Sequence, residues 1–328
     1  MDRDILEQNQ IPIYFVAVIA AAMGGLMVPL AAHGLNALVT PTIVVLMYAM
    51  FLQIPFLDLR EGLSNKRFMS ALLIANSVLI PLLVWGLTRG LTDHPAILVG
   101  ALLVLLTPCI DYVVVFTHIG KGDSRGILAA TPILLLLQLV LLPLYLAFML
   151  GGRSEVVISI GPFVEAFLVL IVAPLLLAVV TSALSKRWSI VGGWNAAWAW
   201  LPVPAMAAVL ITVVGSQISS VVRDIDQLAP VIPVYIGFIL LAPLIGALAS
   251  KVFKLPSTTA RAVTFSSSTR NSLVVLPLAL ALPEEIRGLA AAAVITQTLV
   301  ELVGELIYIR AIPALVWRKK SQIASMAP

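Results

Sequence analysis

Leu106-Thr107-Pro108-Cys109-Ile110-Asp111-Tyr112 is the stretch that decides the fold of this chain. It places a helix-breaking proline, the only cysteine and a carboxylate inside a long apolar run. A second interrupted run, Ser266-Ser267-Ser268-Thr269-Arg270-Asn271-Ser272, follows at an offset of 162 positions, which pairs Thr107 with Thr269 and Cys109 with Asn271. Proline lacks an amide hydrogen, and hydroxyl side chains compete for backbone hydrogen bonds. Both stretches therefore predict breaks in apolar helices.

The chain as a whole is too apolar for a water-soluble protein of its length. Hydrophobic residues make up 61% of the 328 residues, charged residues make up 11%, and the mean hydropathy is +1.08. Because a helix needs about 20 apolar residues to cross a bilayer, the apolar runs predict an all-α membrane protein with about ten spans. The predicted spans are residues 11–32, 38–57, 69–88, 96–117, 127–150, 158–181, 196–215, 230–250, 262–282 and 288–312.

The basic residues are distributed unevenly between the two sides of the membrane. The side with the N-terminus, every second connection and the C-terminal tail carries fifteen Lys and Arg, the other side carries four, and Arg270 lies within a span. This bias predicts a plasma (inner) membrane protein with both termini in the cytoplasm. The basic residues that raise the pI to near 9.3 are thus explained by membrane orientation, and we expect no nucleic-acid partner. The first ten residues lack a basic n-region and a cleavage site, so we expect no cleaved signal peptide.

The same offset of 162 positions recurs outside the two breaks. It carries Pro81 onto Pro243, and Arg125-Gly126 onto Arg287-Gly288. With five spans in each half, the second half enters the membrane from the opposite side, so we predict two inverted five-helix repeats with crossing fourth and ninth helices. The predicted unit is a single polytopic domain, residues 1–328, with repeats at about 11–150 and 158–312.

Paired interruptions at matching places in two inverted halves are typical of the midplane binding site of a transporter. Where the breaks cross, helix termini present amide donors to anions and carbonyl oxygens to sodium. The alternative is two kinked helices that serve packing alone. The polar groups expected to line a substrate are Thr107, Ser268 and Asn271 in the breaks and Asn76 in the third span, with Gln138 as a further amide.

Cys109 lies in the middle of the first break. A lone buried cysteine is usually a small hydrophobe, but the place beside Pro108 and the correspondence with Asn271 make its sulfur a candidate ligand. One thiolate can bind a thiophilic species such as trivalent arsenic, but it cannot build a closed metal site. We therefore expect Cys109 to contact a metalloid substrate, and we expect no cofactor.

Asp111 and Arg270 are the charged side chains inside the two breaks. An isolated charge at mid-bilayer costs about 2.5–3.5 kcal/mol on insertion scales. Their opposite signs on crossing spans predict a salt bridge between them. In the functional alternative, Asp111 binds a cation or a proton and Arg270 attracts an anion.

Glu301 and Glu305 lie one turn apart on the same face of the tenth predicted span. Glu301 is near mid-depth, and Glu305 is about 6 Å closer to the cytoplasm at a rise of about 1.5 Å per residue. A carboxylate at this depth can exchange a proton with each side in turn, so we expect both to serve ion coupling. The alternative for Glu305 is a place at the interface or a contact with Arg310.

Gly120-Lys121-Gly122-Asp123 matches the GxGD string of intramembrane aspartyl proteases. Those enzymes need the aspartate inside a span, facing a second aspartate, whereas this one falls in a short basic loop. A glycine-rich helix end, followed by Asp123 or Ser124 as the N-cap of the next helix, explains the string better. The sequence also lacks HExxH, P-loop and Gly-x-Ser-x-Gly motifs, and we expect no enzymatic activity.

Four motifs together resemble the bile acid:sodium symporter superfamily, most closely its arsenical-resistance branch: Pro108-Cys109, the loop ending at Asp123, Asn271-Ser272 and Leu299-Val300-Glu301. The resemblance covers essentially all ten spans. It implies a panel domain and a core domain, with crossed, unwound fourth and ninth helices. It also implies that Cys109 coordinates arsenite and that Glu301 couples the movement of a proton or cation.

Two features depart from the relatives that this resemblance indicates. Arg270 is not expected in the ninth-span break of arsenite carriers, and Ser267-Ser268-Thr269-Arg270-Asn271 replaces the Glu-x-x-x-Gln-Asn pattern of sodium-coupled members. We predict a secondary transporter that exports arsenite, or a related trivalent metalloid, in exchange for protons. The alternatives are a sodium- or proton-coupled symporter of small organic anions and, in another class, an intramembrane aspartyl protease. An unpaired Arg270 would favour an anionic substrate.

Overall fold

The computed structural model describes residues 6, 9–53, 65–110, 112–150, 165 and 168–316. Within these residues all regular secondary structure is helical, and the one β-type pairing is an isolated bridge between Pro108 and Arg270. The prediction of an all-α protein is confirmed for this part of the chain. In chain order the elements are α2 (Gln10–Met27), α3 (Pro29–Gln53), α5 (Lys66–Ile74), the π-helical turn η2 (Ala75–Leu79), α6 (Ile80–Leu87), the 3-10 turn η3 (Thr88–Leu91), α7 (Pro95–Leu105), α8 (Val113–Ile119), α9 (Ser124–Leu150), the π-helical turn η4 (Leu168–Val172), α11 (Ala173–Ser185), α12 (Ser189–Trp198), α13 (Pro202–Arg223), α14 (Ile225–Leu228), the 3-10 turn η5 (Ala229–Val231), α15 (Ile232–Val252), α16 (Ser257–Ser268), α17 (Ser272–Leu280) and α18 (Glu284–Leu315).

Several helical segments are long and apolar enough to cross a membrane. Four qualify as continuous segments: Lys66–Leu91, Pro202–Arg223, Ile225–Val252 and Glu284–Leu315. A fifth is α9, whose two halves meet at a bend of 47°. The bend falls one turn before Pro143, which cannot donate to the carbonyl at that point. Shorter apolar helices lie in four of the other five predicted spans. The chain is a multi-pass membrane protein, and the count of ten spans stays a prediction.

The boundary between the first two spans differs from the hydropathy prediction. α2 ends at Met27 and α3 begins at Pro29, whereas the apolar runs predict spans at 11–32 and 38–57. The single connecting residue, Val28, has φ −131° and ψ 74°. A residue before proline is driven out of the helical region by the proline ring, so the chain turns here rather than at the following polar residues.

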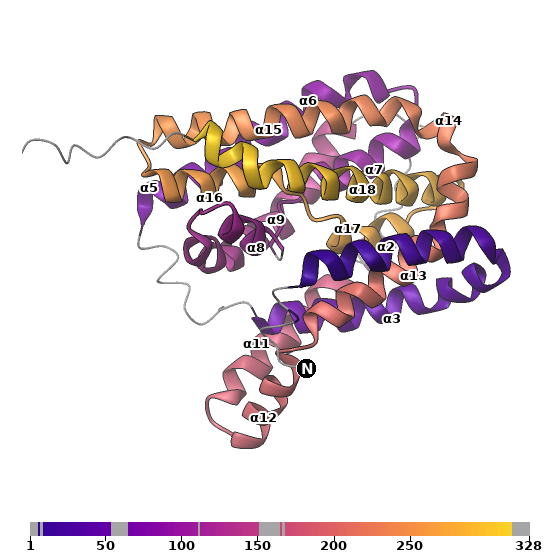
Figure 1. Ribbon diagram of the computed structural model, residues 1–328, viewed down its shortest axis with the longest axis horizontal. Helices are drawn as coiled ribbons and strands as arrows, with labels where there is room; N and C mark the ends of the chain where they lie inside the picture. Colours follow the sequence, from indigo (N-terminus) through magenta and orange to yellow (C-terminus); the bar gives the residue numbers. More distant parts are fainter. Residues whose placement is uncertain are drawn as a thin grey trace, which may run out of the picture.

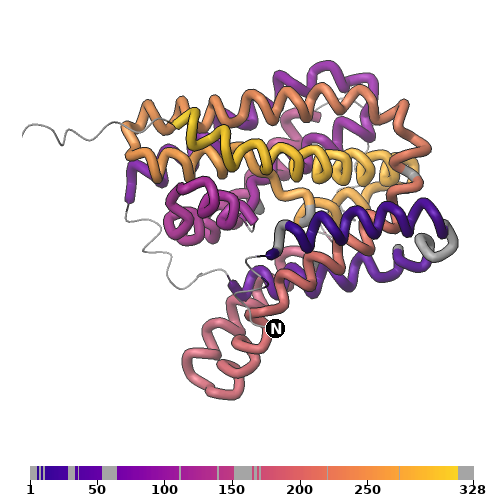
Figure 2. The backbone as a smooth tube through the Cα atoms, in the orientation of Figure 1, coloured from indigo at the N-terminus to yellow at the C-terminus, as the bar shows by residue number. Residues whose placement is uncertain are grey.

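The helices form two groups (Figure 1). In one, α13 packs against α2 and α3, and α11 packs against α3 and α12. In the other, α7 packs against α18, and α15 packs against α5, α6 and α16. Figure 2 shows the second group as orange and yellow C-terminal segments lying against purple segments from the first half of the chain. The division into a panel domain and a core domain, which the resemblance implies, stays a prediction.

Close helix contacts in the second group hold the two interrupted helices in place. A Cβ atom at Gly100 of α7 would overlap the backbone carbonyl of Ala290 on α18. A Cβ atom at Gly246 of α15 would overlap the Ser267 hydroxyl and crowd Thr264 on α16. Because glycine carries no side chain, the helices that end at the breaks can approach their neighbours this closely.

Pro81 interrupts the backbone hydrogen bonds of the α5–η2–α6 helix. Its missing amide hydrogen leaves the Ser77 carbonyl, four residues earlier, without a helical donor. The Tyr145 hydroxyl on α9 donates to this carbonyl at 2.5 Å. A tyrosine from another helix therefore satisfies an acceptor that the membrane interior could not.

The proline at the corresponding position in the second half also frees a carbonyl that a tyrosine satisfies. Pro243 lies 162 positions after Pro81 and leaves the Ile239 carbonyl without a helical donor. The Tyr308 hydroxyl on α18 donates to this carbonyl at 2.7 Å. In each half, a tyrosine hydroxyl thus donates to the carbonyl that a proline leaves without a helical donor.

Tyr145→Phe and Tyr308→Phe are each expected to destabilise the protein by about 1–3 kcal/mol, because each leaves a buried carbonyl without a donor. The measurement is the midpoint of thermal unfolding in detergent. Tyr48→Phe is the control: the Tyr48 hydroxyl bonds the side chains of Thr181 and Trp194, which can turn to other partners. Midpoints of the two variants equal to that of the control would contradict this account.

Candidate functional site at the helix crossing

Two extended segments replace the helix at the predicted breaks. One separates α7 from α8, and the other separates α16 from α17. The segments run antiparallel and pair at Pro108 and Arg270. The prediction that the two breaks meet is confirmed.

A pair of backbone hydrogen bonds holds the two segments together. The Cys109 amide donates to the Thr269 carbonyl at 3.2 Å, and the Asn271 amide donates to the Thr107 carbonyl at 2.9 Å. The offset of 162 positions exchanges Cys109 with Asn271 and Thr107 with Thr269, so it converts one bond into the other. Four backbone groups that would lack partners in the membrane interior are satisfied in this way.

Arg270 is fully buried, and its guanidinium group faces the oxygen atoms of neutral groups. Nη2 donates to Asn76 Oδ1 at 2.9 Å and to the carbonyls of Ser266 and Ser267 at 2.8 and 2.7 Å. Nη1 lies 3.5 Å from the Leu105 carbonyl. In the described part of the chain, no carboxylate lies within salt-bridge distance of the guanidinium. Carbonyl and amide oxygens therefore bind Arg270 here.

The expected partner of Arg270 is Asp111, which lies outside the described residues. The salt bridge between them and the ion-coupling role of Asp111 stay predictions.

Glu301 joins α18 to the extended segment of the second break. It is buried, and its Oε1 accepts the Arg270 backbone amide and the Tyr112 hydroxyl, each at 2.9 Å. Its Oε2 accepts from the side-chain amide of Gln297, one turn earlier. The Tyr112 hydroxyl also lies 2.9 Å from the Arg270 carbonyl. A change of charge at Glu301 would therefore act directly on the backbone of the crossing.

For Glu305, the interpretation as an interfacial residue is wrong. The side chain is fully buried: Oε1 accepts from the Thr269 hydroxyl at 2.7 Å, and Oε2 has no partner in the part of the chain that the structure describes. Arg310, its other expected contact, is exposed. Glu305 shares a face with Glu301, and α18 places that face against the crossing rather than the membrane surface.

The crossing brings together the other residues predicted in the breaks. Cys109, Thr107 and Asn271 are fully buried, and Ser268 is nearly so. The Thr107 and Ser268 hydroxyls donate within their own helices, to carbonyls four residues earlier at 2.8 and 2.7 Å. Asn271 caps α17, since its Oδ1 accepts the Val274 amide at 3.1 Å, and its Nδ2 is buried without a partner.

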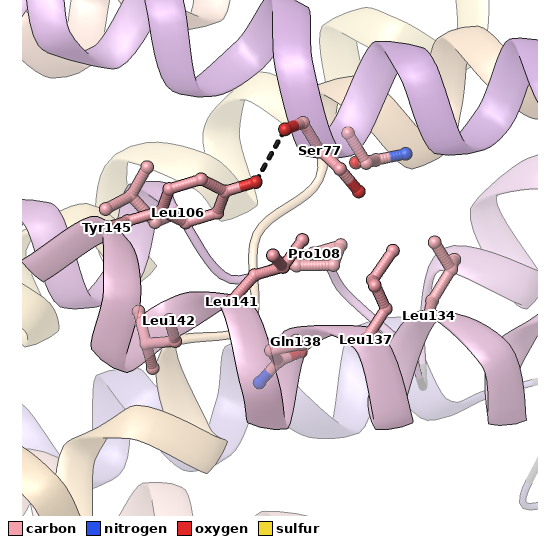
Figure 3. Close-up of a pocket in the computed structure, with 10 residues that line it drawn as sticks. Ser77, Leu106, Pro108, Leu134, Leu137, Gln138, Leu141, Leu142 and Tyr145 are labelled. Atoms are coloured by element: carbon pink, nitrogen blue, oxygen red, sulfur yellow. Dashed lines mark hydrogen bonds between the residues drawn. The ribbon is translucent and has the colours of Figure 1, made fainter.

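A small pocket lies beside the crossing. Figure 3 shows Pro108 between Ser77 on one side and Gln138 of α9 on the other, with leucine side chains around them. Asn76 and Tyr145 also line the pocket, and Gln138 Oε1 is buried without a partner. The two predicted amides, Asn76 and Gln138, thus border one cavity, and Asn76 connects it to Arg270.

Asp123 caps a helix, as the sequence predicts. Its Oδ1 accepts a hydrogen bond from the Gly126 amide at 2.9 Å in the first turn of α9. Its own backbone amide donates to the Thr258 carbonyl at 3.0 Å. Lys121, two residues earlier, has φ 57°, which makes the tight turn between α8 and α9. The string that matches intramembrane proteases serves this turn.

Sequence reasoning missed three residues around the site: Tyr112, Gln297 and Tyr145. Tyr112 is the last residue of the first break. Gln297 precedes Glu301 by one helical turn, so its position beside a buried carboxylate could have identified it from the sequence. Nothing in the sequence pairs Tyr145 with Ser77, because their contact depends on how α9 packs against η2.

Comparison with known proteins gives a family. Residues 40–224 match the family model described as Sodium Bile acid symporter family, which is more than half of the 328 residues. The matched region contains the first break and ends before the second. No curated protein matches the chain. With its apolar helices and its buried helix crossing, this protein belongs to the sodium bile acid symporter family.

Proposed function

We propose that this protein is a secondary active transporter that exports arsenite, or a related trivalent metalloid, in exchange for protons. Its family implies transport of a small solute with a coupling ion, commonly Na⁺. The observation that carries the proposal is the buried crossing, where the thiol-bearing Cys109 and the carboxylate of Glu301 are bonded to the same extended segment. Buried ionisable groups of this kind mark ion pathways in membrane proteins.

The proposed architecture is one polytopic domain of ten spans, built as two inverted repeats. Adding 162 to the bounds of α7 gives 257–267, and α16 is Ser257–Ser268. The same offset applied to α9 gives 286–312, and α18 is Glu284–Leu315. The paired hydrogen bonds of the crossing support this symmetry. The distribution of Lys and Arg supports a plasma (inner) membrane location with cytoplasmic termini.

The proposed substrate site combines one soft ligand with hydrogen-bonding groups. Cys109 supplies the sulfur for a trivalent metalloid. Asn271 Nδ2 and Gln138 Oε1 are buried and have no hydrogen-bond partners among the described residues. Buried polar atoms are costly to leave unpaired, so they suit the hydroxyl groups of a small neutral solute such as arsenous acid. Thr107, Ser268 and Asn76 complete the proposed site.

Proton exchange is proposed to take place at Glu301, with Glu305 as its neighbour. Gln297 suits both forms of Glu301: its amide nitrogen donates to the carboxylate, and its Oε1, which has no partner, could accept the O–H of the acid after a flip of the amide. The proton can therefore come and go without leaving an unpaired group. Because Glu301 also holds the Arg270 amide, each step would alter the crossing.

The test of this function is arsenite sensitivity. A strain that lacks arsenite exporters should regain growth in arsenite when it carries this gene, and inverted vesicles should accumulate arsenite under an imposed pH gradient. Vesicles without the protein are the control. Accumulation that follows a sodium gradient and ignores pH would contradict proton exchange.

The family match favours a second candidate, sodium-coupled uptake of a small organic anion. Arg270 is the natural anion ligand in that case. Its Nη atoms are, however, engaged by Asn76 and by carbonyls of α16, so an anion would have to displace them. Sodium-dependent uptake of an organic anion without any arsenite phenotype would establish this second function.

A further inference from the structure

We propose that the Arg270 guanidinium group is a built-in cation, which fills a cage of oxygen atoms that would otherwise take a dissolved monovalent cation such as Na⁺. The inference rests on the proposed transport function and deepens it, because it concerns which cation the crossing uses. It follows from the oxygen atoms that accept hydrogen bonds from the guanidinium and from the helices to which those oxygen atoms belong.

Three of the four oxygen atoms in the cage lie at the C-terminal ends of interrupted helices. The carbonyls of Ser266 and Ser267 are in the last turn of α16, and the carbonyl of Leu105 ends α7. Carbonyls in a last turn have no helical partner and carry the negative end of the helix dipole. Two such ends converge inside the membrane, where positive charge is needed to balance them.

The fourth oxygen atom is Asn76 Oδ1, from the π-helical turn η2. Asn76 Nδ2 donates to the Leu72 carbonyl and to the Ser266 hydroxyl, each at 3.1 Å. These bonds fix the amide with its oxygen toward Arg270, at 2.9 Å from Nη2. The cage is thus assembled from three separate segments, and the bonds that orient the Asn76 amide do not involve the arginine side chain.

The geometry around Arg270 differs from ordinary arginine recognition. Arginine usually presents a planar fork to a carboxylate or phosphate and forms two parallel bonds. Here three neutral oxygens converge on the single atom Nη2 at 2.7–2.9 Å, while Nε is buried without an acceptor among the described residues. Several carbonyl oxygens around one point are the usual ligands of a monovalent cation at broken helices.

This arrangement has a consequence for transport. A cation that is covalently attached cannot leave, so the cage stays filled in every step of the cycle. The Phe238 ring, whose centroid lies 5.4 Å from the guanidinium carbon, closes the cage further. Ion exchange is then left to the neighbouring carboxylates of Glu301 and Glu305, which fits a proton as the coupling ion.

Replacing Arg270 with a small neutral residue should open the cage to Na⁺. We expect purified Arg270→Ser protein to unfold at a lower temperature than the wild type in choline chloride, and its midpoint to rise by roughly 3–6 °C in NaCl at equal concentration. The wild type should show no comparable rise, because its cage is occupied. Arg270→Lys keeps a cation in place and should not respond to Na⁺ either.

Arg261→Ser is the matched control, since Arg261 is also buried on α16 and also donates to carbonyls, those of Lys121 and Pro313. Arg261 lies outside the crossing, so Arg261→Ser should lower the midpoint of thermal unfolding by the same amount in both salts. If Arg270→Ser does not fold in either salt, Arg270→Gln replaces it, with the same expected response to Na⁺. Equal midpoints in NaCl and choline chloride for the Arg270 variant, or an equal Na⁺ response in the wild type, would overturn the proposal. No substrate or gradient is present in this measurement, so its result is independent of the arsenite test.

Discussion

Cys109→Ser is expected to abolish arsenite export while the protein still folds. Serine keeps the size and the hydrogen-bonding capacity of the side chain but removes the soft sulfur that a trivalent metalloid requires. The Cys109 amide, which holds the crossing, is unchanged by the substitution. We expect the initial rate of export to fall by at least about tenfold, or about 1.4 kcal/mol of lost interaction.

The single cysteine allows a direct measurement of binding. Cys109 is the only thiol in the chain, so all labelling by a maleimide reports this position. Arsenite should slow the labelling of the wild-type protein, and the midpoint of thermal unfolding should be similar in wild type and Cys109→Ser. Thr131→Ser is a suitable control, because Thr131 is buried on α9 outside the proposed site and serine keeps the hydroxyl that donates to the Ile127 carbonyl.

Normal arsenite resistance in cells with Cys109→Ser would remove the coordination role of the thiol. Labelling of the wild type at the same rate with and without arsenite would have the same meaning. Either result would move the substrate toward the organic anions of the second candidate.

Glu301→Gln is expected to stop transport driven by a pH gradient while arsenite still binds. Glutamine mimics the permanently protonated acid, so the site can no longer release a proton to one side and take it up from the other. One amide oxygen can still accept the Arg270 backbone amide, which keeps the crossing paired. Accumulation in inverted vesicles should fall to the level of vesicles without protein, whereas protection of Cys109 from maleimide should remain.

Two other carboxylates of α18 serve as comparisons. Glu284 is exposed at the start of the helix, where it pairs with Arg287 at 3.0 Å, and Glu284→Gln should leave transport unchanged. Glu305→Gln should reduce transport less than Glu301→Gln, because Glu305 bonds the Thr269 side chain and not the backbone of the crossing. Full proton-driven transport by Glu301→Gln would show that this carboxylate does not carry the proton.

The positions of the two breaks could be predicted from sequence because they depend on local chemistry. Pro108 cannot donate a backbone hydrogen bond, and a run of hydroxyl and amide side chains near Asn271 offers the backbone other partners. The cap at Asp123 follows from equally local preferences. Hydropathy did not predict the exact ends of the first two spans, because the sequence is apolar on both sides of Pro29, where α2 gives way to α3.

The partners of the charged residues could not be predicted from charge alone. The pairing of Arg270 with Asp111 stays a prediction, because Asp111 lies outside the described residues. The contacts described for the guanidinium are with Asn76, 194 positions away, and with carbonyls in the last turn of α16. The alternative place of Glu305 at the interface followed from its depth, whereas its side chain is buried against Thr269. The depth of a residue along a helix can be estimated from its position in the sequence, whereas packing decides which face of the helix turns toward a neighbour.

The sequence by itself determined that this chain crosses the membrane as helices, where two of them break and which ionisable groups the membrane interior contains, because composition, proline chemistry and the rise per residue act locally. Only the tertiary structure decided what those groups bond. The two breaks meet in one backbone bridge, Glu301 holds the Arg270 amide, and tyrosines from other helices satisfy the carbonyls freed by Pro81 and Pro243. Such contacts join residues from 31 to 194 positions apart. They depend on the rotation and close approach of packed helices, which no local pattern specifies.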